Sequence, residues 1–247
     1  MKLNKPEALT SGPVNGPEAL PPQLLIVAFL GGECTGKTTL AMQLARALGA
    51  PYVPEALRDF VDLHGRCPTR EEQQPLLMEQ CRRIQEAISD AVRIGLQSGQ
   101  PEAGHAPAAC GGFPRSGITP SLVLCDPSPW MTAIYSLQYF ADHTLFAPAA
   151  RAMRELARSA HAHWVHLHCA GDLPWEADGL QRDGPAQRAA TASLLVRYPP
   201  AGFAPPAGVA GDMRERLAMA LCAVGEVMTV SGLSLSRNRH MLRSLLS

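Results

Sequence analysis

The sequence lacks the features that mark several large classes of protein. Over 247 residues the formal net charge is zero, so no basic excess predicts nucleic acid or an anionic membrane surface as a partner. Apolar runs such as Leu24 to Leu30 are far too short to cross a bilayer. The seven cysteines form no C-x-x-C pair, which favours reduced thiols over a disulfide framework. We therefore expect a cytoplasmic protein that binds neither nucleic acid nor a membrane.

The chain divides into a short leader and one long globular region. Residues 1–22 contain Pro, Gly and Glu but no apolar core segment, so we expect a disordered leader and not a secretory signal. Residues 23–247 show no internal repeat and no second core, which predicts a single domain. Two stretches dominated by Gly, Pro and Ala, at about 97–120 and 198–211, are expected to be loop insertions.

The most informative stretch follows the first apolar run directly and reads G-G-E-C-T-G-K-T. It fits the pattern G-x-x-x-x-G-K-[ST] in its required context, between a predicted strand and an apolar-periodic helix. Its glycines let successive N–H groups point at one anion, and the helix adds the positive end of its dipole. Lys37 can reach the β- and γ-phosphates, and Thr38 can offer a hydroxyl to Mg²⁺. The residues expected to bind ATP are Gly31, Gly32, Glu33, Cys34, Thr35, Gly36, Lys37, Thr38 and Thr39.

Two features of this stretch have a second interpretation. A tight strand-to-helix turn with a surface lysine is the alternative for the whole motif, and the surrounding strand and helix argue against it. Cys34 is either an oxidation-sensitive thiol beside a helix N-terminus or a small residue that fills the loop.

Hydrophobic patterning along the chain predicts strands that alternate with helices. The expected strands are residues 24–30, 51–54, 121–125, 163–169 and 226–230. Helices are expected at residues 37–48, 130–140, 148–159, 185–197 and 212–223, with one more that begins at Glu55 and a closing helix from Ser234. A long helix is also expected to begin at a capping box formed by Thr69 and Glu72 and to run to about residue 96, with a kink or restart at Pro75. This alternation predicts a three-layer α/β fold with a five-stranded, mostly parallel sheet.

Charged residues follow the predicted strands at the edge where α/β proteins bind ligands. Glu55 and Arg58 follow the second strand, and Asp126 follows the third. Transfer of a phosphoryl group to a hydroxyl needs a carboxylate for the acceptor, another near Mg²⁺, and cations over the transferred group. Glu55 suits the first role, Asp126 the second, and Arg182 and Arg188 the third.

Each of these residues also has a purely structural interpretation, which stays open at this point. Glu55 fits a solvated acid at a helix N-terminus, where the helix dipole favours negative charge. Asp126 precedes Pro127 and fits an N-cap residue, a role that is compatible with metal binding. The two arginines fit a solvated face.

Four histidines surround the fourth predicted strand, at positions 161, 163, 166 and 168. Histidines two residues apart share one face of a strand and could bind a metal. No cysteine or carboxylate completes the set at a usual spacing, so an ordinary packed strand is the favoured interpretation.

Three segments together resemble a known family. They are GGECTGKTTL at the phosphate loop, EALRDF after the second strand, and PWEADGLQR at residues 174–182 after the fourth strand. They resemble the ribosylnicotinamide kinase domain of NadR-type NAD-salvage proteins, over about Leu24 to Leu246. The resemblance implies a P-loop NTPase fold of the nucleoside- and nucleotide-kinase type. It also implies transfer of the γ-phosphate of ATP to nicotinamide riboside, giving NMN and ADP in NAD biosynthesis.

The same resemblance assigns roles to individual residues. It implies that Gly31, Gly36, Lys37 and Thr38 hold ATP and Mg²⁺, that Asp126 lies near the metal, that Glu55 and Arg58 hold the acceptor, and that Trp175, Asp178 and Arg182 belong to a lid. Together with the residue-based reasoning above, this gives four sets of expected site residues. The catalytic residues are Lys37, Glu55, Asp126 and Arg182, and the substrate-binding residues are Glu55, Arg58, Asp126, Trp175 and Asp178. The lid arginines are Arg182 and Arg188, and the metal ligands are Thr38 and Asp126.

One departure from the family pattern leaves the acceptor open. The family often has an aromatic residue just before the glutamate that follows the second strand, and this chain has Pro54 there. Tyr52 is close but is expected to point to a different face. The alternative function is an ATP- or GTP-binding switch without a metabolic acceptor. The guanine-reading N-K-x-D signature is absent, which argues against a GTPase.

Overall fold

The centre of the protein is a parallel β-sheet of five strands. The computed structural model describes residues 24–98, 121–176 and 184–230. The strands are β1 (Leu24–Leu30), β2 (Tyr52–Val53), β3 (Ser121–Cys125), β4 (Ala162–Cys169) and β5 (Ala207–Val209), in the order β2-β3-β1-β4-β5. All four strand pairings are parallel. The three-layer α/β fold expected from the sequence is confirmed.

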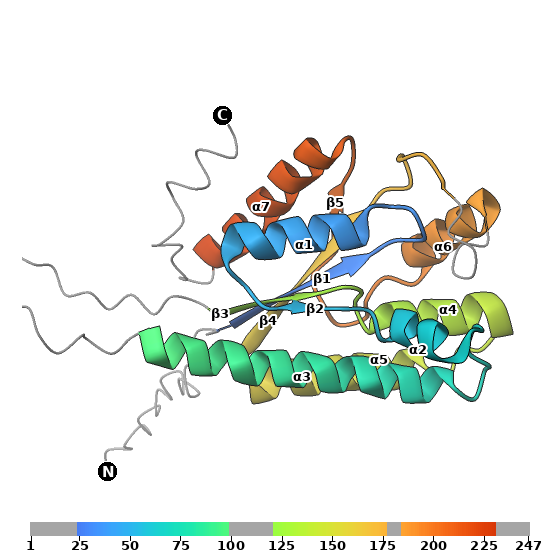
Figure 1. Cartoon of the computed structure of the whole chain (residues 1–247), viewed down its shortest axis with the longest axis horizontal. Coiled ribbons are helices and arrows are strands. Elements are labelled where there is room, and N and C mark those ends of the chain that lie inside the picture. Colours follow the sequence, from blue (N-terminus) through green and yellow to red (C-terminus); the bar gives the residue numbers. More distant parts are fainter. Residues whose placement is uncertain (1–23, 99–120, 177–183, 231–247) are drawn as a thin grey trace, which may run out of the picture.

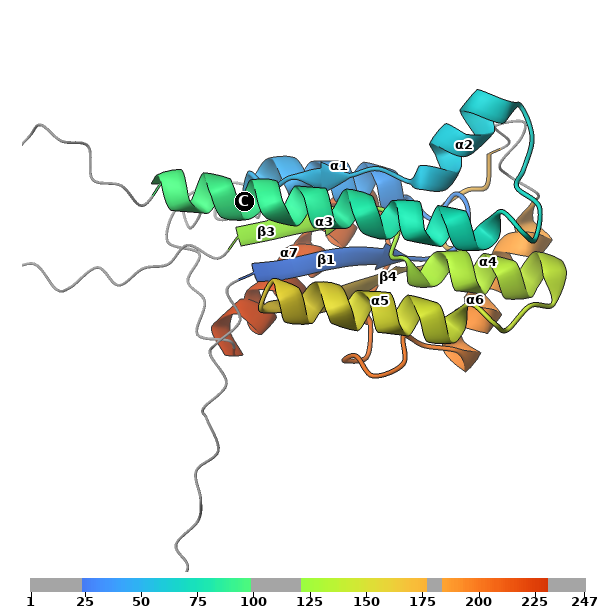
Figure 2. The ribbon, with the colours of Figure 1, turned by 90° about the horizontal axis from the view of Figure 1, so that it is seen from below.

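Helices cover both faces of this sheet. They are α1 (Lys37–Leu48), α2 (Ala56–His64), α3 (Gln73–Ser98), α4 (Trp130–Phe140), α5 (Phe146–Ser159), α6 (Pro185–Arg197) and α7 (Met213–Val230). In Figure 1, α1 and α7 lie on one side of the strands, and α3 and α5 lie on the other. Figure 2 shows the second side, where α3, α4 and α5 run across the sheet. No helix in these described ranges is long and apolar enough to cross a membrane.

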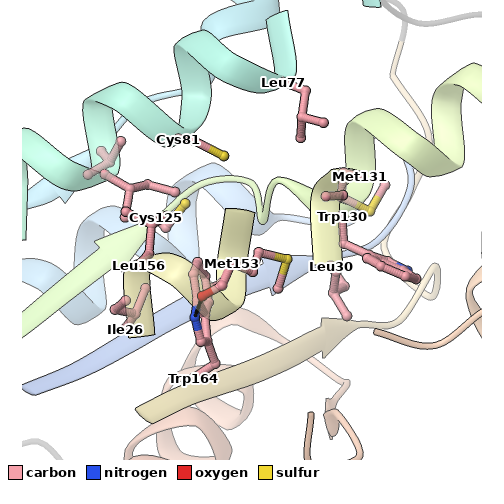
Figure 3. Packing of buried hydrophobic residues seen from close by; sticks show 14 of the residues in the cluster. Ile26, Leu30, Leu77, Cys81, Cys125, Trp130, Met131, Met153, Leu156 and Trp164 are labelled. Carbon is pink, nitrogen blue, oxygen red and sulfur yellow. Dashed lines mark hydrogen bonds between the residues drawn. The ribbon is translucent and has the colours of Figure 1, made fainter. Parts of the chain in front are cut away.

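The central strand β1 separates two hydrophobic cores. All seven of its residues are buried, as expected for a strand with helices on both faces. Its even-numbered side chains pack with α3, α4 and α5, and its odd-numbered side chains pack with α1 and α7. Figure 3 shows the first core, in which the Trp164 indole N–H donates to the carbonyl of Met153, at 2.9 Å. The strand order and these two cores place the carboxyl end of β1 at the middle of the sheet edge.

Two helix ends test the local sequence signals. Gly49 ends α1 with φ 62°, as the expected C-terminal glycine should. The Glu72 carboxylate accepts the backbone N–H of Thr69 at 2.7 Å, as in a capping box. The kink or restart expected at Pro75 is wrong, because α3 is a single helix from Gln73 to Ser98. Pro75 falls in its first turn, where a missing backbone donor has no helical acceptor to lose.

The position of the fifth strand was predicted wrongly. Residues 226–230 continue α7, because Ala220, Val224 and Met228 keep one helical face in the second core. The true β5 lies inside the stretch expected to be a loop at 198–211, and it pairs with β4 from Leu167 to Cys169. Three residues flanked by proline carry too little periodicity to reveal a strand. The leader, most of the 97–120 insertion and the closing helix from Ser234 lie outside the described residues.

Candidate active site

The phosphate loop lies at the carboxyl end of β1, where the chain turns into α1. Gly31 has φ 141°, and a Cβ there would lie 2.8 Å from the carbonyl oxygen of Cys169. Gly36 has φ 74°, and a Cβ there would lie 2.9 Å from Cδ1 of Leu173. Both positions combine a backbone conformation that favours glycine with close neighbours. The loop therefore has the compact shape that the sequence motif predicts.

The interior of the loop is organised around one backbone carbonyl. Gly32 O accepts the Lys37 ammonium at 2.7 Å and the Thr35 hydroxyl at 2.8 Å. The ammonium is thus held over the loop itself. Helix α1 has no side-chain cap and no acidic residue in its first turn, so its first N–H groups are open to an anion.

Asp126 lies at the end of β3 and is buried, with 2% of its surface exposed. Its backbone N–H donates to Val53 O at 3.0 Å, and its carboxylate accepts the Tyr52 hydroxyl at 3.2 Å. It does not cap α4, since the Ser128 hydroxyl accepts the N–H of Trp130 at 3.3 Å. Tyr52 was expected to point to a different face, and its position fits that expectation. Its ring packs on the α1 side of the sheet, and its hydroxyl reaches Asp126.

Glu55 occupies the N-cap position of α2 but makes no capping hydrogen bond. Gln80 of α3 satisfies the first N–H of α2, because its side-chain oxygen accepts the N–H of Ala56 at 2.8 Å. The half-buried Glu55 carboxylate makes no hydrogen bond to any described residue. Burial raises the pKa of Glu55 to about 7, the Lys37 ammonium opposes that rise, and the Asp126 carboxylate adds to it. Glu55, Lys37 and Asp126 therefore form one electrostatic cluster.

A pocket opens beside Glu55, between α2, α3 and α4. It is a small pocket whose lining combines apolar and aromatic side chains with a few polar groups. Its lining residues are Glu55, Ala56, Leu57, Gln73, Leu76, Gln80, Pro127, Thr132 and Tyr135. Burial raises the pKa of the Tyr135 phenol well above its ordinary value, and the Glu55 carboxylate adds to that rise.

Three arginines were expected at the site: Arg182 and Arg188 near the transferred group, and Arg58 at the acceptor. Arg188 of α6 donates from Nη1 to Leu173 O at 2.7 Å and to Cys34 O at 3.4 Å, so it lies against the phosphate loop. Arg58 is exposed on α2, where its charge lowers the pKa of Glu55. Arg182 lies outside the described residues, as does Asp178.

The segment after β4 also contacts the loop. The Cys34 thiol donates to Glu176 O at 3.1 Å and accepts the Glu176 N–H at 3.4 Å. These contacts agree with the filler role for Cys34. The neighbouring Trp175 is half-buried, and its indole N–H has no hydrogen-bond partner among the described residues.

The histidines near β4 form no metal centre. His166 is buried and stacks on Trp164 with ring centroids 5.7 Å apart. Within the ranges that the structure describes, no group of three or more His, Cys, Asp or Glu side chains could hold a metal ion. The interpretation as an ordinary packed strand agrees with this arrangement.

Sequence reasoning missed three residues that shape the site. Gln80 and Tyr135 lie in helices whose apolar periodicity makes every inward position look like core. Arg216 of α7 is fully buried and donates to the carbonyl of Thr35 at 3.0 Å. For Arg216 the sequence did contain a signal, because an arginine there interrupts the apolar stripe of the helix.

The comparisons with known proteins agree with this geometry. A family model described as an AAA domain matches residues 26–100. No curated protein matches the chain. A solved structure of NadR protein in complex with NR has a TM-score of 0.52 and 15% identity, covering 87% of this chain and 53% of that one. The chain has a P-loop kinase-like fold.

Two further solved structures were found in the same comparison. NadR protein in complex with NAD and AMP-PNP has a TM-score of 0.50 and 14% identity, covering 87% of this chain and 51% of that one. A gluconokinase from Sinorhizobium meliloti 1021 has a TM-score of 0.38 and 16% identity, with 85% and 95% covered. The P-loop kinase-like chain spans about half the length of the NadR structures that it matches. At these identities the likeness concerns the fold alone.

Proposed function

We propose that this protein is an ATP-dependent phosphotransferase whose acceptor is a hydroxyl of a small molecule, with nicotinamide riboside as the leading acceptor. The observation that carries the proposal is the placement of Glu55. The Lys37 ammonium of the phosphate loop lowers the pKa of this carboxylate, and Glu55 also lines the pocket of mixed polarity, which supports a role at both sites. A donor site and an acceptor site therefore share one carboxylate.

On the donor side, the loop supports binding of the ATP phosphates. Lys37 and the open N-terminus of α1 supply positive charge where the γ-phosphate would lie. Mg²⁺ favours oxygen ligands and typically keeps only one or two protein groups beside the phosphates. The Thr38 hydroxyl and the buried Asp126 carboxylate fit that requirement, and the ion would neutralise charge on the phosphates.

On the acceptor side, Glu55 is the proposed general base. The acceptor oxygen forms a bond to the γ-phosphorus, the bond from that phosphorus to the leaving oxygen of ADP breaks, and the acceptor proton passes to Glu55. A carboxylate with a pKa of about 7 is suited to this transfer near neutral pH. Arg58, on the next turn of α2, is proposed to contact the acceptor.

Tyr135 supports the choice of a nicotinamide-type acceptor. Pro54 removes the aromatic side chain that the family often carries before Glu55, and the Tyr52 hydroxyl is engaged by Asp126. Tyr135 lines the pocket and offers another aromatic ring, and the carboxylates of Glu55, Glu33 and Asp126 all act on its phenol. A pyridinium ring is a cation that aromatic faces and carboxylates both attract.

The proposed lid comprises Trp175, Asp178, Arg182 and Arg188. Arg188 supports this assignment, because its guanidinium already lies within hydrogen-bond distance of the loop carbonyl of Cys34, at 3.4 Å. The half-buried indole of Trp175 has an N–H that a bound substrate could engage.

The donor half can be tested by labelling Lys37. The only other lysines of the chain are Lys2 and Lys5. An acyl-phosphate derivative of ATP acylates an amine beside its terminal phosphate, so it should label the peptide that contains Lys37, and ATP should prevent this. Labelling confined to Lys2 and Lys5 would contradict the donor site.

The acceptor half needs a turnover assay. A panel of nucleosides, including nicotinamide riboside, is screened for stimulated ADP release. Lys37→Ala should abolish that release, and wild-type turnover in this variant would refute the assignment. Slow hydrolysis that no acceptor stimulates would instead favour the switch ATPase.

A further inference from the structure

Arg216 of α7 connects the phosphate loop to the segments that follow β4 and β5. The side chain is fully buried, with 0% of its surface exposed. Nε donates to Gly211 O at 2.7 Å, Nη1 to Thr35 O at 3.0 Å, and Nη2 to Ala170 O at 3.2 Å. Nη2 also pairs with the Asp172 carboxylate. One guanidinium thus bridges the loop, the end of β4 and the turn before α7.

This arginine stands where helix periodicity calls for an apolar residue. Arg216 shares a face of α7 with Ala220, Val224 and Met228, all of which pack in the second core. It also lies in the first turn of the helix, where positive charge opposes the helix dipole. Packing and helix electrostatics therefore both disfavour arginine here, and its contacts with the loop account for its presence.

We propose that Arg216 is a positioning residue for phosphate binding, because it fixes the orientation of the Thr35–Gly36 peptide. In a trans peptide the C=O and the N–H point in opposite directions. With the Thr35 carbonyl held by Arg216, the Gly36 N–H of the same peptide is turned away from Arg216. That N–H is one of the donors that a loop of this kind offers to phosphate.

The frame around Arg216 is rigid enough for this role. The Asp172 carboxylate accepts the Gly211 N–H at 2.6 Å, so Asp172 and Arg216 both hydrogen-bond to the backbone of Gly211. Asp212 and Glu215 cap the start of α7 reciprocally, at 2.8 and 2.9 Å. Lysine would retain the charge but would lack the planar fork that reaches three carbonyls at once.

The inference rests on the proposed phosphate-binding role of the loop. Its test is calorimetric binding of MgATP and of inorganic tripolyphosphate to wild type, Arg216→Lys and Val224→Ala at 15 °C. Arg216→Lys should weaken both ligands by the same factor, about tenfold, as expected for loss of a hydrogen bond to a charged group. Val224→Ala is the matched control, because it disturbs the buried face of the same helix without touching the loop. It should lower the melting temperature and leave both Kd values unchanged.

The outcomes separate this inference from the proposed function. If wild type binds both ligands and Arg216→Lys binds them equally well, the result contradicts the positioning role of Arg216 and still agrees with the proposed function. If wild type binds neither ligand, both fall. Should Arg216→Lys fail to fold, NMR of the wild-type protein provides the second test. The Gly36 N–H and Arg216 Nε–H signals should both shift on addition of tripolyphosphate, and an unmoved Gly36 signal would overturn the inference.

Discussion

Replacing Glu55 with glutamine should abolish phosphoryl transfer and at the same time stabilise the protein at alkaline pH. Burial raises the pKa of this carboxyl from 4.5 to about 7, so the folded protein holds its proton more tightly than the unfolded chain does. The stability linked to this proton is complete below pH 4.5 and is lost as the pH rises through 7. Glutamine mimics the protonated carboxyl and does not ionise.

The size of this effect on stability follows from the shift in the pKa of Glu55. A rise of this size in pKa corresponds to a loss of about 3 kcal/mol on ionisation. Because Glu55 is only half-buried, water reduces the effect, and we expect about 1–3 kcal/mol. The difference in unfolding free energy between Glu55→Gln and wild type should therefore grow by that amount between pH 5 and pH 8.

Urea denaturation of both proteins at a series of pH values measures this difference. Glu155→Gln is the control, because Glu155 is exposed on α5 and forms no hydrogen bond within the described part of the chain. In wild type, kcat/KM should rise with pH through about 7, since the base must be ionised. A difference in stability that is constant with pH would refute the reasoning, as would a Glu55→Gln enzyme with wild-type turnover.

Two further substitutions probe the loop and the start of α2. Gly36→Ala should weaken MgATP binding at least about tenfold, because a left-handed backbone is costly for alanine and Leu173 Cδ1 would lie 2.9 Å from the new Cβ. Gly49→Ala, which has φ 62° but no atom within 4 Å, should cost about 1–2 kcal/mol of stability and leave binding unchanged by calorimetry. Gln80→Ala should lower kcat without changing the Kd of MgATP, because Glu55 can then turn to cap α2; an unchanged kcat would contradict this.

Local sequence patterns were enough to predict most of the fold. The boundaries of β1, β3, α1 and α6 agree with the residues expected from apolar runs, glycines and proline. These signals are local, because each depends on a few neighbouring residues. The fifth strand was misplaced because β5 exists only through its pairing with the end of β4. A three-residue strand without alternation has no local pattern to recognise.

The candidate site also has a part that local sequence patterns predict and a part that they do not. The phosphate loop is one continuous segment, so its motif predicts its shape directly. The proposed acceptor pocket is assembled from three helices, and the residues that distinguish it, Gln80 and Tyr135, match the core pattern of their own helices. The first N–H of α2, beside Glu55, is satisfied by a hydrogen bond between residues 24 positions apart. No single segment contains that information.

The proposed donor site and the proposed acceptor site are supported by helices on opposite faces of the sheet, which pack in different hydrophobic cores. The loop passes into α1 and is held by Arg216 of α7, and both helices pack in the core with Leu25, Val27 and Phe29. The acceptor pocket lies between helices α2, α3 and α4, of which α3 and α4 pack in the core with Ile26 and Leu30. Because β1 separates these cores, changes in α3 or α4 can reshape the acceptor pocket without moving the phosphate loop. If the proposed function holds, a fold arranged in this way can change its acceptor while it keeps ATP as its donor.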